Sequence, residues 1–144
     1  MLTKAVRLYG ANDLRVEKFE LPEIGENEVL IKVVSDSLCA STYKAVIQGT
    51  AHKRVPENIA QNPVIIGHEM CGTVVKAGAD VADKWKVGQN IVIQPALKLD
   101  NGHDPGYSYQ YIGGNSIYAI VPEIVLERGC LVAYNGAGFY KGSL

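Results

Sequence analysis

A histidine and a glutamate stand side by side in a glycine-rich segment, Gly67-His68-Glu69-Met70-Cys71-Gly72. Zinc metalloproteases carry such a pair in a His-Glu-x-x-His helix, where a second histidine completes the metal site. Position 72 is glycine in this chain, so that second ligand is missing. The glycines, with β-branched residues between them, favour a strand and a turn over a helix. The residues therefore argue against a protease.

The spacing of this segment resembles the zinc signature of the medium-chain, zinc-dependent alcohol and polyol dehydrogenases. Every fixed position of the pattern Gly-His-Glu-x-x-Gly-x-x-x-x-x-Gly-x-x-Val is present, in Gly67, His68, Glu69, Gly72, Gly78 and Val81. Upstream, Cys39-Ala40-Ser41 resembles the family's first zinc ligand with its proton-relay residue two positions later. Downstream, the similarity continues through Trp85–Val92, Gly113-Gly114 and Tyr118–Pro122, and it spans about residues 4–126 in the right order.

The resemblance implies one catalytic zinc, held by Cys39 and His68. Glu69 would be a third ligand, or would alternate with water at the open position. Ser41 and Glu69 would be the catalytic residues, and Ser41 would carry a proton away from the zinc-bound oxygen. A nicotinamide, NAD or NADP, would exchange the hydride. Tyr43 and Lys44 would face the substrate, where Lys44 could meet an anionic group.

The chain departs from the family pattern in two places near this site. No cysteine falls in residues 95–112, where many members bind a structural zinc, so we expect none here. Thr42 and Lys44 replace the aspartate and histidine that often follow the relay residue, which changes the expected relay and substrate contacts. Cys71 and Cys130 lie in apolar strand-like segments and are interpreted as buried free thiols.

The surrounding pattern predicts a mainly β domain, a GroES-like, partly open β-barrel with a few short helices. Strands are expected over residues 4–9 and 14–19 as a hairpin, and over 29–34, 64–66, 73–76, 89–94, 118–122 and 129–134. A short helix is expected over residues 41–48, with Ser41 as a possible N-cap and Gly49 after its end. Residues 98–115, which contain Tyr107, Tyr109 and Tyr111, are expected to form a long loop. The alternation of the three tyrosines suggests that their side chains are half-buried. The polar surroundings of His52 and His103 suggest that both histidines lie at the surface.

The resemblance also predicts how the chain is organised. Residues 1–130 would form the zinc-binding domain, and residues 131–144 a linker or the start of a nucleotide-binding domain. Gly136–Gly142 looks like a dinucleotide fingerprint but lacks the helix and βαβ unit that such a motif requires. We therefore expect a fragment that is inactive alone.

Composition excludes several classes of protein. The formal net charge is -1 with no basic run, which gives no sign of a nucleic-acid partner. No apolar stretch is long enough to span a membrane, and the N-terminus lacks a signal-peptide core. Three sparse cysteines make a poor disulfide framework. We expect a cytoplasmic enzyme, homo-oligomeric at full length.

The expected reaction interconverts a secondary alcohol and a ketone, on a polyol, sugar or sugar phosphate such as a ketose phosphate. A zinc-free reductase of the quinone oxidoreductase type is one alternative, but such members usually lack the Cys39 and His68 ligands. A non-enzymatic GroES-like module is another, although it has no need of a ligand set.

Overall fold

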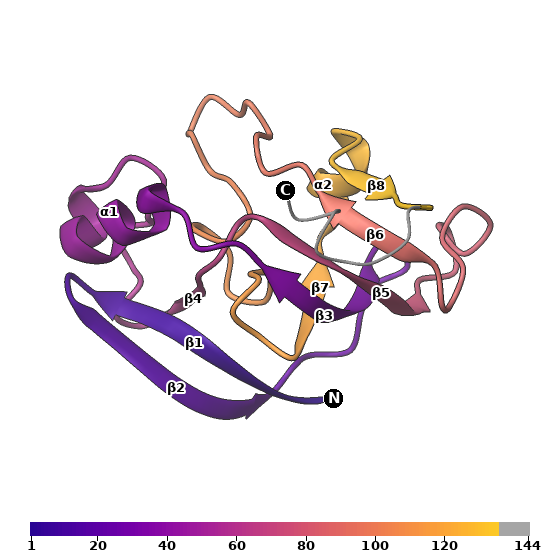
Figure 1. The fold of residues 1–144 in the computed structure, drawn as a ribbon, viewed down its shortest axis with the longest axis horizontal. Coiled ribbons are helices and arrows are strands. Elements are labelled where there is room, and N and C mark those ends of the chain that lie inside the picture. Colours follow the sequence, from indigo (N-terminus) through magenta and orange to yellow (C-terminus); the bar gives the residue numbers. More distant parts are fainter. Residues whose placement is uncertain (136–144) are drawn as a thin grey trace.

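The computed structural model describes residues 1–135, which form two antiparallel sheets and a few short helices (Figure 1). One sheet has the order β2-β1-β4, from β1 (Leu2–Gly10), β2 (Asp13–Glu20) and β4 (Val64–Ile65). The other has the order β7-β3-β5-β6-β8, from β3 (Val29–Asp36), β5 (Met70–Ala77), β6 (Asn90–Ile93), β7 (Tyr118–Val121) and β8 (Leu131–Ala133). The helices are α1 (Ala40–Gln48), α2 (Glu123–Glu127) and the 3-10 turn η1 (Gly49–Ala51).

The prediction of a mainly β, GroES-like fold with a few short helices is confirmed, and both sheets remain open. The expected N-terminal hairpin is β1–β2, whose turn places Asn12 at a φ of 58°. Asparagine tolerates this left-handed backbone better than most residues. None of the helices in residues 1–135 is long and apolar enough to cross a membrane.

Two apolar clusters fix the sheets and α1. The larger lies on the five-stranded sheet and includes Val29, Ile31, Val74 and Ile91, all essentially inaccessible. The second packs Ala45 of α1 against Leu8 of β1, Val64 of β4 and Tyr107 of the long loop. The second cluster therefore holds the start of α1, the segment before β5 and the loop together.

Element boundaries differ from the sequence-based expectation in a way that matters for chemistry. Strand β5 begins at Met70 rather than at residue 73, so Gly72 lies inside the strand. Only glycine fits at position 72, because a Cβ there would overlap the Lys32 carbonyl oxygen on β3. Helix α1 begins at Ala40 with Cys39 as its N-cap, so Ser41 is not the cap. Helix α2 was not foreseen, and its short run after Pro122 has no long apolar period to reveal it.

Strand β8 pairs with β6 through Leu131↔Ile93 and Ala133↔Ile91. The five-stranded sheet therefore continues past the expected domain boundary at residue 130, and that boundary remains a prediction. The glycine-rich segment Gly136–Gly142 lies outside the described residues.

Residues 94–117 connect β6 to β7 as a long loop, as expected for residues 98–115. Gly106 has a φ of +76°, and its α-carbon lies so close to residues 67–68 that a Cβ would overlap the Gly67 carbonyl oxygen. Gly88 has a similar φ of +86° but has open space around it. Both positions therefore require left-handed backbone, but only Gly106 also lacks space for a Cβ. Substitutions at the two glycines can distinguish the cost of backbone strain from the cost of close packing.

We predict that Gly88→Ala destabilises the chain by about 1–2 kcal/mol, the cost of left-handed backbone for an L-residue. Gly106→Ala adds overpacking of roughly 1–3 kcal/mol on top of that strain. Urea unfolding followed by circular dichroism measures both variants. Equal losses of stability in the two variants would show that the contact at Gly106 relaxes without cost.

Candidate metal centre

His68 is placed by the backbone immediately before β5. Gly67 adopts a φ of +96°, and its carbonyl oxygen accepts a hydrogen bond from the Gly114 N–H at 2.7 Å. A Cβ at residue 67 would overlap the side chains of Asp36 and Asn115. Glycine at this position therefore lets residues 113–115 close over the segment and turn His68 inward.

Cys39, His68 and Glu69 converge on one point from two segments. One ligand atom of each, the Cys39 sulfur, a His68 ring nitrogen and a Glu69 carboxylate oxygen, lies within 4.8 Å of the other two. Ligands about 2.0–2.3 Å from a tetrahedral zinc stand roughly 3.3–3.8 Å apart, so a small contraction would close the set. Cys39 is the N-cap of α1, where the helix dipole favours a negative charge. A thiolate, an imidazole and a carboxylate are donors that suit zinc.

The His68 ring is oriented by Thr42. Thr42 Oγ1 lies 3.1 Å from His68 Nδ1, and donation from Nδ1–H to this oxygen leaves Nε2 with a free lone pair. Burial lowers the pKa of His68 below its ordinary value of 6.5, so the ring is neutral at pH 7. Its 3.6 Å approach to the Glu69 carboxylate is therefore not an ion pair. A neutral imidazole is the form that binds a metal.

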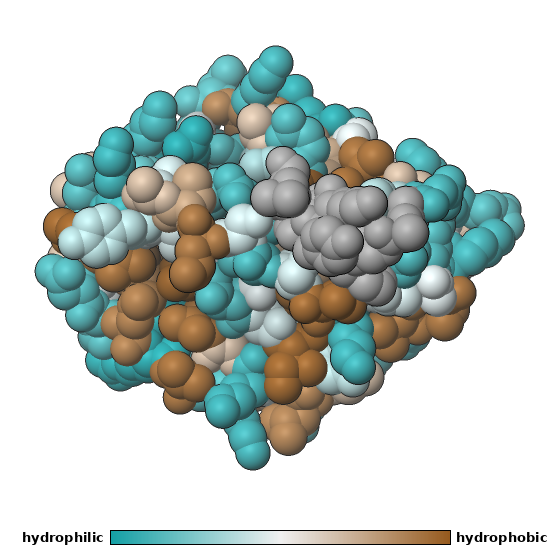
Figure 2. Space-filling model, viewed as in Figure 1, coloured by the Kyte–Doolittle hydropathy of each residue, from teal (hydrophilic) through white to brown (hydrophobic). Residues whose placement is uncertain are grey.

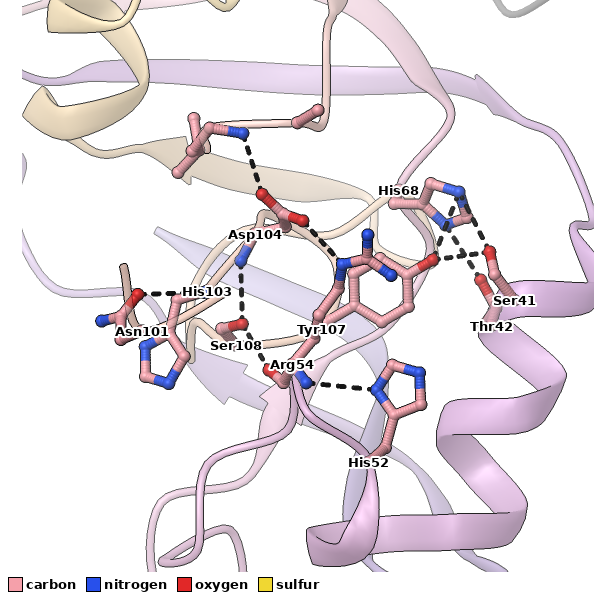
Figure 3. Close-up of polar contacts among 12 residues, drawn as sticks. Ser41, Thr42, His52, Arg54, His68, Asn101, His103, Asp104, Tyr107 and Ser108 are labelled. Carbon is pink, nitrogen blue, oxygen red and sulfur yellow. Dashed lines mark hydrogen bonds and ion pairs between the residues drawn. The ribbon is translucent and has the colours of Figure 1, made fainter. Parts of the chain in front are cut away.

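Ser41 and Tyr107 form a hydroxyl pair beside the ligand atoms (Figure 3). The two oxygens are 2.7 Å apart, and Ser41 Oγ lies 3.1 Å from the Cys39 sulfur. Each hydroxyl also approaches His68 Nε2, at 3.4 Å from Ser41 and 3.3 Å from Tyr107. Burial raises the pKa of Tyr107 above its ordinary value of 10.0, so its hydroxyl stays protonated and can donate.

Glu69 is held through its backbone. Its N–H donates to Asp36 Oδ1 at 3.0 Å, while Asp36 Oδ2 accepts from the Asn115 side chain at 3.0 Å. Burial raises the pKa of the Asp36 carboxyl to about 6. The Glu69 side chain itself is 38% exposed, so it can move toward or away from the other two ligands.

Arg54 and Asp104 form a partly buried ion pair behind Tyr107 (Figure 3). Arg54 Nε donates to Asp104 Oδ2 at 2.7 Å, and the guanidinium carbon lies 5.3 Å from the centre of the Tyr107 ring. His52 stacks on the same tyrosine at a ring-centre distance of 5.8 Å. Tyr107 thus contacts both the Arg54 guanidinium and the His52 ring.

Two cavities include metal-ligand residues in their linings. One of about 220 Å³ is lined by polar Ser41, Arg54, His68, Asp104 and Tyr107 with Pro95 and Ala96. The other, of about 460 Å³, is largely apolar and lies around Cys39, with Leu14, Leu38, Tyr43 and Val46 among its lining residues. Figure 2 shows apolar side chains gathered on the side of the molecule that carries α1.

The structure brings together Cys39, Ser41, His68 and Glu69, while other predicted residues lie apart. Tyr43 lines the apolar cavity and is largely exposed, and Lys44 is exposed on α1 and lines neither cavity. His52 and His103, expected at the surface, are partly exposed, and their rings pack against Tyr107 and Tyr109 respectively. Cys71 and Cys130 are buried thiols, as expected.

Thr42, Arg54, Asp104 and Tyr107 were not identified from the sequence as residues around the ligands. The tyrosine alternation suggested half-buried packing, but Tyr107, in the expected loop, is only 3% exposed. Thr42 stood out only as a departure from the family pattern. Neither residue carries a local signal, because its contacts come from distant segments.

Comparison with known proteins identifies the family of the chain. The family of the alcohol dehydrogenase GroES-like domain matches residues 25–131, and the chain belongs to that family. It is 45% identical over 142 residues to the mannitol-1-phosphate 5-dehydrogenase of Aliivibrio fischeri. The matched region covers 99% of this chain and 34% of that protein. It is 44% identical over 143 residues to the L-sorbose 1-phosphate reductase of Klebsiella pneumoniae, covering 99% and 35%. The chain thus spans about a third of the length of these curated relatives.

Among solved structures, the 2R,3R-butanediol dehydrogenase of Bacillus subtilis superposes with a TM-score of 0.79 at 28% identity. The match covers 98% of this chain and 43% of that one.

We predict that Thr42→Val weakens zinc binding roughly 10–100-fold, because His68 loses the partner that fixes its tautomer and orientation. Competition with a chromophoric chelator measures the affinity. The matched control is Thr50→Val, at an exposed position, which should bind zinc like the wild type. An unchanged affinity in Thr42→Val would mean that the Nδ1 contact does not orient the ring for the metal.

Proposed function

We propose that this chain is the zinc-binding catalytic domain of a longer, NAD(P)-dependent oxidoreductase that interconverts a secondary alcohol and a ketone. The observation that carries the proposal is the convergence of Cys39, His68 and Glu69 beside a polar cavity. A zinc ion held by these residues would polarise a carbonyl or make a hydroxyl more acidic. One catalytic zinc and no structural zinc are proposed.

The chain's own residues would position the substrate. Ser41 Oγ contacts both Tyr107 and His68, so the serine is placed to accept a hydrogen bond from a substrate hydroxyl in the polar cavity. Tyr107 remains protonated and is placed to hydrogen-bond the substrate oxygen or Ser41. Glu69 is exposed enough to act as a ligand that exchanges with water.

The substrate class is proposed from the names of the relatives. Two of them, similar to this chain over nearly its whole length, are named for a hexitol phosphate and a ketose phosphate. We propose a polyol, sugar or sugar phosphate as the substrate, with Tyr43 at the apolar side of the site. The longer protein is proposed to be a cytoplasmic homo-oligomer.

A zinc-free reductase of the same family is the competing proposal. Its site has no need of a thiol, an imidazole and a carboxylate within 4.8 Å of one another. Metal content therefore distinguishes the two functions directly, without any need for turnover.

We predict about one zinc per chain in the purified wild-type protein, measured by elemental analysis. Cys39→Ala and His68→Ala should each lose it, because either change removes a ligand and leaves too few donors. Cys130→Ala and His103→Gln are the matched controls, and both should retain zinc. Zinc absent from the wild type after reconstitution at neutral pH, or retained in both ligand variants, would refute the proposed site.

A further inference from the structure

A second cavity adjoins the polar cavity at the metal ligands. It measures about 180 Å³, and the two cavities share Arg54, Ala96 and Asp104 as lining residues. The second cavity adds Lys53 and Lys98, with Leu99 and Gly102. The second cavity therefore lies next to the one beside His68, with Arg54 and Asp104 in the lining of both, and it has two further lysines in its own lining.

Asp104 holds the two walls of this second cavity together. Its Oδ2 accepts from Arg54 Nε at 2.7 Å, and its Oδ1 accepts from the backbone N–H of Leu97 at 2.8 Å. The Ser108 hydroxyl donates to the Arg54 carbonyl oxygen at 2.5 Å. Segment 53–54 and segment 97–98 are thus joined through one buried carboxylate, and the ion pair uses Nε of Arg54 rather than its terminal nitrogens.

The charge in the cavity is not balanced. Its lining contains three cationic residues, Lys53, Arg54 and Lys98, and a single carboxylate, Asp104, whose two oxygens are already engaged. Neither lysine belongs to an ion pair among residues 1–135. Lys98 also has a φ of 55°, a backbone conformation that is uncommon for lysine and is kept where surrounding contacts impose it. The contacts of Leu97 and Gly102 flank this residue.

We propose that Lys53, Arg54 and Lys98 form a subsite for the phosphate group of a phosphorylated sugar or polyol, whose reacting carbon lies beside His68 and Ser41. The inference rests on the proposed function and narrows its substrate class from polyols, sugars and sugar phosphates to phosphate monoesters alone. Arg54 supplies planar donors fixed by Asp104, and the two lysines supply point charges, a combination suited to a phosphate dianion. It assigns anion recognition to these residues instead of Lys44, which lines neither cavity.

A phosphate group on the nicotinamide cofactor has the same chemistry as one on the substrate. The basic cavity shares Arg54, Ala96 and Asp104 with the cavity that contains Ser41 and His68, and this proximity favours the substrate. The apolar cavity around Cys39 has no basic residue in its lining. The two sources are separated by the experiment below.

The test titrates the zinc-free chain with inorganic phosphate at constant ionic strength, and follows backbone amide NMR signals. We expect saturable shifts at residues 53–54 and 97–99. Lys53→Gln and Lys98→Gln should each raise the dissociation constant roughly fivefold, the effect of one exposed ion pair. Lys32→Gln, which removes an exposed charge on β3 away from the cavity, should leave it unchanged. Arg54 is left intact because its removal would strand buried Asp104.

A second arm compares L-sorbose 1-phosphate with adenosine 2′-phosphate as competitors of inorganic phosphate. We expect the sugar phosphate to displace it and to shift Ser41 and His68 as well. Displacement by the adenosine compound alone would assign the cavity to the cofactor and overturn the proposal. Absence of saturable shifts, or equal affinities in wild type and both lysine variants, would also overturn it. Zinc content of the same preparations separates the two proposals, because a zinc-binding chain without phosphate binding leaves the proposed function standing.

Discussion

His68 lies where three backbone segments pass closer together than side chains would permit. Residues 66–67 accept hydrogen bonds from Gly114 and Asn115, and Gly106 rests directly on Gly67 and His68. Gly114 has no room for a Cβ because the Asp36 side chain fills that space. The long loop, the end of β3 and the approach to β5 are therefore interlocked by glycine. The position of every ligand atom depends on this crossing.

Polar groups near the crossing are almost all paired, which keeps the arrangement rigid. Asp104 engages an arginine and a backbone N–H, Asp36 engages a backbone N–H and an amide, and His68 has a partner at each nitrogen. An unpaired buried polar group would be costly in this low-dielectric setting. Because the carboxylates of Asp36 and Asp104 each join two segments, the network restrains the long loop of residues 94–117.

The sequence was informative wherever the signal was local. The spacing of Gly67, His68, Glu69 and Gly72 reflects one turn and one strand, so the segment could be identified from its residues alone. Alternating apolar residues likewise revealed β1 and β2, and a run of β-branched residues revealed β3. The start of α1 was misplaced by one residue because either Cys39 or Ser41 could precede the helix, and Ser41 turned out to contact Tyr107 instead.

The residues around the ligands could not be found in the same way. Arg54 and Asp104 are 50 residues apart in the sequence. Their ion pair brings Arg54 to the segment that contains Tyr107. No period or motif records such a contact. The tyrosines of the loop looked alike in the sequence, and only packing against His52 and His68 distinguishes Tyr107 from Tyr109 and Tyr111.

The Cys39–His68 pair has a consequence for how the protein lasts in a cell. A metal held by both residues would join α1 to the segment before β5, and so act as a removable cross-link across a long stretch of chain. Its contribution to stability would rise with the logarithm of the free metal concentration. Cellular zinc supply would then govern the lifetime of the folded domain, because scarcity exposes it to proteolysis before any catalytic step is reached.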